Sequence, residues 1–283
     1  MKIQDFTRII PKQGHEEWPN KLGQMIALFY QAEYQTVKKK LRTAAIIHVN
    51  SNNLQTFLEK VNKDQLVFTF IRKTALFNGF SSLVKPVKEG EPFIWIGCLT
   101  RTYKEGEKFK EADLKNDHRT VGQMLGYPDC CIDYFISTFP IDPCPIWVNL
   151  EGEIKGYPEC NGMLRYFGPI ITAHLSCSPT CQATREIGKT WFKVMQEIDK
   201  DLANEIYNLL TGPITWNSYH GVIQIETPYF VGLNSGLFIL KKPRIIKWQG
   251  VKEISNKKTS LKLKKPKVKK RVNKKFTFFS KHQ

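Results

Sequence analysis

The stretch Gly126-Tyr127-Pro128-Asp129-Cys130-Cys131 places two adjacent thiols directly after a proline. A second stretch, His174-Leu175-Ser176-Cys177-Ser178-Pro179-Thr180-Cys181, places two more thiols and a histidine around another proline. Proline is favoured in the first turn of a helix, and apolar residues follow each stretch at helical spacing. We therefore predict that each pair of thiols lies at a helix start. There, unpaired backbone N–H groups and the positive end of the helix dipole favour thiolate, the form that binds metals and attacks electrophiles.

Working outward, segments with strand character flank this thiol-bearing middle of the chain. Apolar residues at helical or strand spacing predict mainly helical structure over 1–40, helices over 52–61, 118–125 and 182–210, and strands over 44–49, 66–71, 93–98 and 214–238. These patterns predict an α+β fold, in which small sheet-forming N-terminal and C-terminal parts flank a Cys-rich helical middle.

The net charge of +17 is concentrated at the C-terminal end. Of the 43 Lys and Arg residues, 13 lie in residues 251–283 with a single acid, Glu253, so this segment carries +12 of the total. A segment of this composition cannot bury itself, and we predict a disordered Lys-rich tail. The predicted organisation is an α/β N-terminal region over 1–107, a Cys/His site-bearing α+β domain over 108–250, and the tail over 251–283.

Phosphate backbones are the expected partner of such a tail, which makes a nucleic acid a plausible partner. The alternative is a solvated polycation that binds any polyanion. The candidate nucleic-acid contacts are Lys264, Lys265, Lys267, Lys269, Lys270 and Arg271.

The compartment is predicted from what the sequence lacks. No stretch approaches the roughly 20 apolar residues of a membrane helix, and the first residues lack the apolar core of a secretory signal. We therefore expect a cytoplasmic protein without a membrane partner, whose seven cysteines stay reduced. An odd number of reduced thiols favours metal binding or thiol chemistry over a disulfide framework. The oligomeric state stays open.

The candidate metal ligands are Cys130, Cys131, His174, Cys177 and Cys181, and zinc and an iron–sulfur cluster both fit these residue types. The alternative is that the cysteines are small buried hydrophobes. Adjacent residues of a helix diverge by about 100°, so we expect that one thiol of the vicinal pair is a ligand while the other packs inward or stays free. The pair could also bind different metals of one cluster.

Three residues are candidates for catalysis: Cys131 as a thiolate nucleophile, His118 as a general base or proton carrier, and Arg165 as an anion clamp. An enzyme is favoured because five candidate ligands exceed the four of a closed structural zinc site. The alternatives are a non-enzymatic nucleic-acid-binding protein with a structural zinc, and a metal-free thiol redox enzyme.

The remaining cysteines carry weaker signals. Cys98 lies in an apolar strand and is predicted to be part of the core. Cys160 could complete a site or be structural, and the role of Cys144, which lies between two prolines, stays open.

The motifs from Asp117 to Cys181 resemble an uncharacterised prokaryotic family, a domain of unknown function. Its members carry Gly-Tyr-Pro-x-Cys-Cys and His-x-x-Cys-Ser-x-x-Cys, which match Gly126–Cys131 and His174–Cys181 here. The matching stretch covers about residues 108–190. The resemblance implies that residues 118–181 form one site and brings no established activity. The Lys-rich tail lies outside it.

Overall fold

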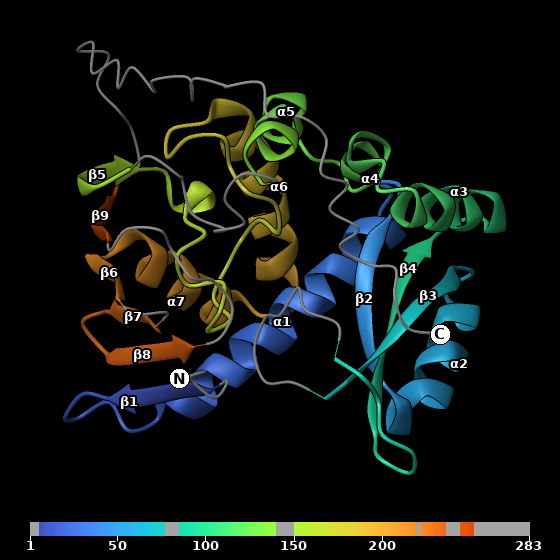
Figure 1. Ribbon diagram of the computed structural model, residues 1–283, viewed down its shortest axis with the longest axis horizontal. Coiled ribbons are helices and arrows are strands. Elements are labelled where there is room, and N and C mark those ends of the chain that lie inside the picture. The colour runs from blue at the N-terminus through green and yellow to red at the C-terminus, as the bar shows by residue number, and fades with distance from the viewer. Residues whose placement is uncertain (1–5, 77–84, 140–149, 220–221, 236–243, 252–283) are drawn as a thin grey trace, which may run out of the picture.

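The computed structural model describes residues 6–76, 85–139, 150–219, 222–235 and 244–251 of the chain. Within these ranges lie seven α-helices, nine β-strands in two sheets and two short 3-10 helices (Figure 1). The predicted α+β class is therefore confirmed.

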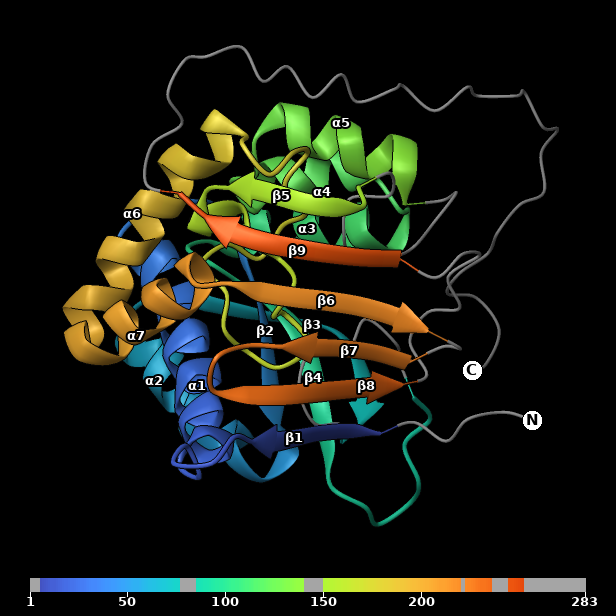
Figure 2. The same ribbon diagram turned by 90° about the vertical axis from the view of Figure 1, so that its left-hand side faces the viewer.

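The larger sheet has six strands in the order β1-β8-β7-β6-β9-β5 (Figure 2). All neighbouring pairs are antiparallel except β5–β9, which is parallel. Residues alternate between buried and exposed along β9, so one face of the sheet meets a core that contains Trp216 and Trp248. The strands are β1 (Thr7–Pro11), β5 (Gly152–Gly156), β6 (Ile214–Tyr219), β7 (Val222–Glu226), β8 (Phe230–Ser235) and β9 (Arg244–Gly250).

The smaller sheet is antiparallel, with β4 (Phe93–Thr100) between β2 (Ala45–Asn50) and β3 (Val67–Ala75). Helix α2, which spans Leu54–Lys63 after the 3-10 turn η1 (Ser51–Asn53), packs against one face of this sheet. Helices α3 (Tyr103–Leu114) and α4 (His118–Met124) pack against the other face. Both faces of this sheet are therefore covered by helices (Figure 1).

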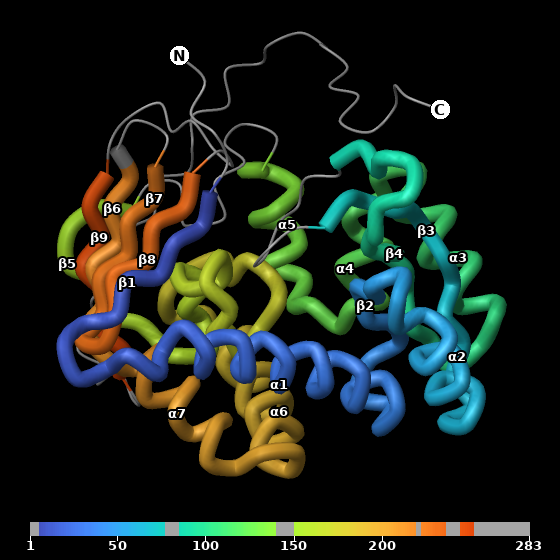
Figure 3. Tube along the Cα trace, turned by 90° about the horizontal axis from the view of Figure 1, so that it is seen from below, coloured from blue at the N-terminus to red at the C-terminus, as the bar shows by residue number. Residues whose placement is uncertain are grey.

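Helix α1 (Trp18–Lys38) connects the two sheets (Figure 3). Leu22 and Met25 in its first half belong to the core of the six-stranded sheet, whereas Tyr34 and Val37 in its second half belong to the core of the three-stranded sheet. Helices α6 (Gln182–Ile198) and α7 (Lys200–Thr211) lie beside α1 and complete the layer over the larger sheet. One amphipathic helix thus contributes to both cores.

Helix α1 confirms the helical structure predicted within residues 1–40, but the segment before it differs from the prediction. Residues 7–11 form β1, an edge strand paired with β8, where mainly helical structure was expected. Pro11 is tolerated because it closes an edge strand, where few backbone N–H groups are needed. The predicted division at residue 107 also differs from the division between the sheets, because β1 joins the larger sheet while α3 and α4 pack against the smaller one.

The described residues also bear on a possible membrane span. None of their helices is both long enough and apolar enough to cross a bilayer.

A buried histidine gives the smaller sheet a predicted pH dependence. Burial, with a smaller contribution from Arg72, lowers the pKa of His48 to about 4, and its Nδ1 lies 3.4 Å from the Tyr30 hydroxyl. The unfolded chain binds a proton here below about pH 6.5, whereas the folded chain does not. Stability present at neutral pH is therefore lost as the pH falls from about 6.5 towards 4, by up to about 3 kcal/mol.

Urea unfolding at several pH values tests this effect in wild type and His48→Gln. We expect the stability difference between the two proteins to shift in favour of His48→Gln as the pH falls through this window. Metal release at low pH affects both proteins alike, so their difference isolates His48. A difference that does not change with pH would contradict the prediction.

Candidate metal centre

The first two thiols lie in the first turn of α5 (Asp129–Thr138), as predicted. The preceding residues fix this start. Gly126, at φ +75°, ends α4 in the left-handed conformation, and the Gly126 and Tyr127 N–H groups donate to the Gln123 and Gly122 carbonyls. These bonds form the Schellman arrangement, which reverses the chain after a helix. Pro128 then caps α5 in an extended conformation. The Gly-Tyr-Pro motif therefore ends one helix and starts the next at Cys130 and Cys131.

The second pair approaches from the loop that leads into α6. Cys181 is the N-cap of α6, and the Thr184 N–H donates to its Sγ at 3.5 Å. Pro179 therefore precedes the helix and does not occupy its first turn, which corrects the predicted helix start. The Pro179 carbonyl instead accepts a bond from the Tyr157 N–H. A Cβ at Gly156 would lie 2.6 Å from this carbonyl, so the close approach of the loop to β5 needs glycine.

The sulfur atoms of Cys130, Cys131, Cys177 and Cys181 all lie within 4.8 Å of one another, a group that could hold a metal ion. Cys181 Sγ lies 3.7 Å from the Sγ atoms of both Cys130 and Cys131, which are 3.9 Å apart. Both members of the vicinal pair thus reach one group, contrary to the expectation that only one would. Cys130 and Cys131 lie in the first turn of α5, and both of their sulfur atoms lie within 4.8 Å of the sulfur atoms of Cys177 and Cys181.

Hydrogen bonds among the thiols shift their pKa values in opposite directions. Hydrogen bonds from the Cys131 and Cys177 thiols hold the pKa of Cys181 far below its usual range. The pKa of Cys177 is raised because its thiol donates to Cys131 and Cys181, and burial adds to the effect. The low pKa of Cys181 and the high pKa of Cys177 thus have the same cause, the hydrogen bonds among these thiols. A bound metal ion replaces the thiol protons, because the thiolate is the ligand form.

His174 lies outside the four-sulfur group, although the sequence made it a candidate ligand. Its Nε2 lies 2.9 Å from the Thr184 hydroxyl oxygen, which in turn lies 3.2 Å from Cys131 Sγ. Burial lowers the pKa of His174 to about 4, so the ring is neutral at pH 7. With Cys131 as thiolate, Thr184 O–H donates to sulfur and accepts from His174 Nε2–H. His174 is thus linked to Cys131 through the Thr184 hydroxyl.

A buried polar layer lies behind His174. The Tyr127 ring packs on the His174 ring with centroids 4.9 Å apart, and Trp191 contacts both rings. The Arg42 guanidinium lies over Trp191 and pairs with Glu33 of α1 at 2.7 Å, both side chains being buried. The rings of His174 and Trp191 are therefore fixed between the thiols and a buried ion pair.

Thr184 is the site residue that sequence reasoning missed. It is fully buried, and its backbone N–H and its hydroxyl each contact a thiol of the group. A signal for it existed, because Thr184 follows Cys181 by three residues, the spacing that links an N-cap to the third residue of its helix. Cysteine is an unusual N-cap, so this spacing alone does not indicate the contact.

Among the described residues, the two other predicted catalytic residues have partners other than the four sulfurs. His118 begins α4 on the surface, with its ring edge against Phe135. Arg165 donates to the Ala173 carbonyl at 3.2 Å and so holds the backbone next to His174. Their roles as proton carrier and anion clamp stay predictions.

The other cysteines occupy different environments. Cys98 is fully buried in β4, which confirms its predicted place in the core. Cys160 lies in the 3-10 turn η2 (Pro158–Cys160), where its thiol donates to the Cys181 carbonyl at 3.6 Å outside the four-sulfur group. Cys144 and the six predicted nucleic-acid contacts, Lys264 to Arg271, lie outside the described residues.

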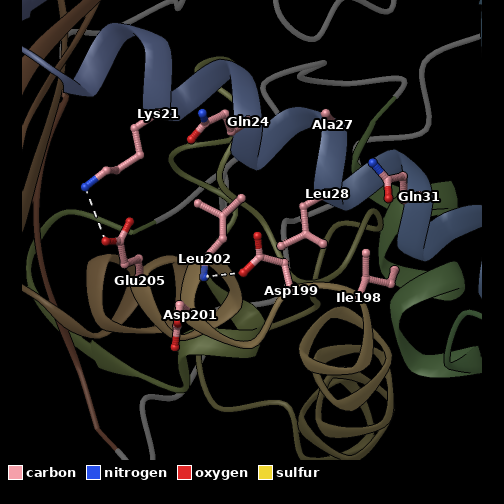
Figure 4. A pocket seen from close by; sticks show the side chains of 10 residues that line it. All are labelled: Lys21, Gln24, Ala27, Leu28, Gln31, Ile198, Asp199, Asp201, Leu202 and Glu205. Atoms are coloured by element: carbon pink, nitrogen blue, oxygen red, sulfur yellow. Dashed lines mark hydrogen bonds and ion pairs between the residues drawn. The ribbon is translucent and has the colours of Figure 1, made fainter.

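A groove of about 680 Å³ runs between α1 and the start of α7 (Figure 4). Lys21 and Glu205 form an ion pair across it at 3.2 Å, and Asp199 caps α7 by accepting from the Leu202 N–H. The charged groups of Lys21, Glu205 and Asp199 therefore already have partners within the protein. No cysteine lines the groove. The full lining is Lys21, Gln24, Ala27, Leu28, Gln31, Ile198, Asp199, Asp201, Leu202 and Glu205.

Comparison of the chain with protein-family models, with curated proteins and with solved structures finds no match. The resemblance to a family of unknown function therefore stays a prediction, and the site is interpreted from its own geometry.

The contacts of Thr184 give a test of the layer behind the sulfurs. Thr184→Val keeps the volume but removes the hydroxyl that joins His174 to Cys131. We expect its affinity for zinc to fall by about 10- to 100-fold, the usual effect of losing such a supporting bond. Competition with a chromogenic chelator measures this affinity. Thr184→Ser keeps the hydroxyl and should stay close to wild type, whereas wild-type affinity in Thr184→Val would show that the hydroxyl plays no part.

Proposed function

We propose that the four cysteines bind one zinc ion in a closed tetrahedral site that stabilises the fold. The observation that carries this proposal is the spacing of the sulfurs. A zinc–thiolate bond is about 2.3 Å long, so the sulfurs of a tetrahedral site lie about 3.8 Å apart. Three of the sulfur pairs lie at 3.7, 3.7 and 3.9 Å, and no pair exceeds 4.8 Å.

The same spacing favours a single ion over an iron–sulfur cluster. In a cluster the thiolates bind different iron atoms, which are themselves separated by bridging sulfide. The cysteine sulfurs must then spread apart around the cluster. Four sulfurs that lie within 4.8 Å of one another therefore support a single ion more than a cluster.

The set of ligands favours a structural role over a catalytic one. Five candidate ligands for four positions favour an enzyme. Since His174 instead bonds Thr184, four thiols remain, which is the number that closes a structural zinc site. The ion would cross-link the starts of α5 and α6. Because α5 follows α4 of the smaller sheet and α6 covers the larger sheet, this link would stabilise the junction between them.

Metal content measured on the purified protein tests this proposal. We expect about one zinc per chain, no visible absorption band, and loss of the zinc in Cys177→Ala/Cys181→Ala. The free energy of unfolding should fall in this variant and on chelation, because the bound ion stabilises the folded chain alone. Cys98→Ala, which removes a buried thiol outside the four-sulfur group, should keep its zinc. Metal-free wild type, or a broad visible band from iron and sulfide, would contradict the proposal.

A second proposal concerns the Lys-rich segment, which we infer to bind the phosphate backbone of a nucleic acid. The observation that favours it is that residues 251–283 carry +12 of the net +17. The folded body thus has little excess charge with which to hold a polyanion. Counterion release would make such binding strongly dependent on salt.

Deletion of residues 252–283 tests this inference and keeps the bond from the Val251 N–H to the Gly156 carbonyl. We expect affinity for a single-stranded RNA oligonucleotide to fall at least about tenfold near 0.1 M salt, with a shallower salt dependence. Fluorescence anisotropy at several salt concentrations measures both quantities. Equal affinity and an unchanged salt slope in the truncated protein would disprove it.

A further inference from the structure

We propose that Cys130 is the reactive thiolate of the four-sulfur group and accepts an alkyl group from a neutral or cationic carbon electrophile. The proposal rests on the zinc site proposed above, because the metal would keep all four sulfurs deprotonated at neutral pH. It adds a reaction to a site for which the number of ligands alone indicates a structural role.

Access to the four sulfurs is unequal. Cys130 is exposed, whereas Cys131 and Cys181 are 2% and 7% exposed, and Cys177 is intermediate. Position explains the difference, since Cys131 points towards Thr184 and the interior, while its neighbour Cys130 lies on the outer side of α5. A reagent in solution therefore meets Cys130 first.

Hydrogen bonding to the sulfurs is also unequal. Cys131 Sγ accepts from the Cys177 N–H at 3.3 Å and contacts the Thr184 hydroxyl, and Cys181 Sγ accepts from the Thr184 N–H. Each donor withdraws electron density from the sulfur and makes it a weaker nucleophile. Among the described residues, no N–H or hydroxyl group donates to Cys130 Sγ, whose contacts are with other sulfurs. Cys177 Sγ likewise accepts no hydrogen bond from an N–H or hydroxyl group among the described residues, so its greater exposure is what distinguishes Cys130 from Cys177.

The reaction is a displacement at carbon. The Cys130 thiolate supplies the electron pair of a new S–C bond, and the bond between that carbon and its leaving group breaks. The leaving group departs with its electron pair, and no proton or oxidant is required. Cys130 becomes a neutral thioether, so the site loses one negative charge.

Charge defines the class of electrophile. Four thiolates around one divalent ion give a net charge of −2, and Asp129 and Asp133 lie on the exposed side of the same helix. The exposed Arg119 side chain is paired with Asp133, which offsets part of its charge. The local field therefore disfavours anionic alkyl donors relative to neutral or cationic ones.

Alkylation of the zinc-loaded protein tests the proposal, with iodoacetamide as the neutral probe and iodoacetate as the anionic one. Cys144→Ser serves as the background, because Cys144 lies outside the described residues. Peptide mass spectrometry then gives the rate at each cysteine. We expect Cys130 to react at least about tenfold faster than any other cysteine, and faster with iodoacetamide than the intrinsic rates of the two reagents on free cysteine explain.

Two controls separate the possible failures. In urea with a chelator, the six cysteines of the background protein should react at similar rates, which would show that the fold and the metal cause the selectivity. Addition of Cys130→Ser should abolish the fast phase. Zinc-loaded protein in which Cys177 reacts first, or all sites react alike, would overturn this inference and leave the zinc site standing. Protein that binds no zinc would instead overturn the proposed function.

Discussion

Four sulfur atoms within 4.8 Å of one another impose the main constraint on this fold. Two unit negative charges about 4 Å apart repel by about 4 kcal/mol near a protein surface, so four thiolates need a cation between them. The start of α5, the N-cap of α6 and the Thr184 hydroxyl all present hydrogen-bond donors or dipoles to this negative charge. The loop from Tyr157 to Cys181 is fixed by Gly156 and by the buried layer around His174 and Trp191.

The sequence predicted where the site lies along the chain better than it predicted which residues form the site. Pro128, before the first thiol pair, correctly indicated a helix start, whereas Pro179, between Cys177 and Cys181, lies before α6 and not in its first turn. His174 looked like a ligand because its spacing to Cys177 suits one. Spacing does not show where a ring points, and the ring turns towards Thr184, a partner ten residues further along the chain. Cys130 and Cys131 converge because Cys177 and Cys181 lie beside the start of α5. No local sequence pattern contains this contact.

The fold, too, was predicted where local sequence patterns determine it and missed where distant contacts do. The helix over 52–61 and the strands near 44–49, 66–71 and 93–98 follow from local apolar spacing and were predicted. The strands β1 and β5 were not, because each is short and is stabilised mainly by pairing with residues far along the chain, β8 and β9 respectively. Helix α1 serves two cores, so its apolar residues could not indicate that the sheets divide between its halves.

X-ray absorption at the zinc edge of the purified protein tests the central claim most directly. The account predicts four sulfur neighbours at about 2.3 Å and no neighbouring metal. A nitrogen neighbour in place of one sulfur would place His174 in the site and contradict the closed set of four thiolates. Absence of zinc, with iron neighbours around sulfide at the iron edge, would contradict the single ion.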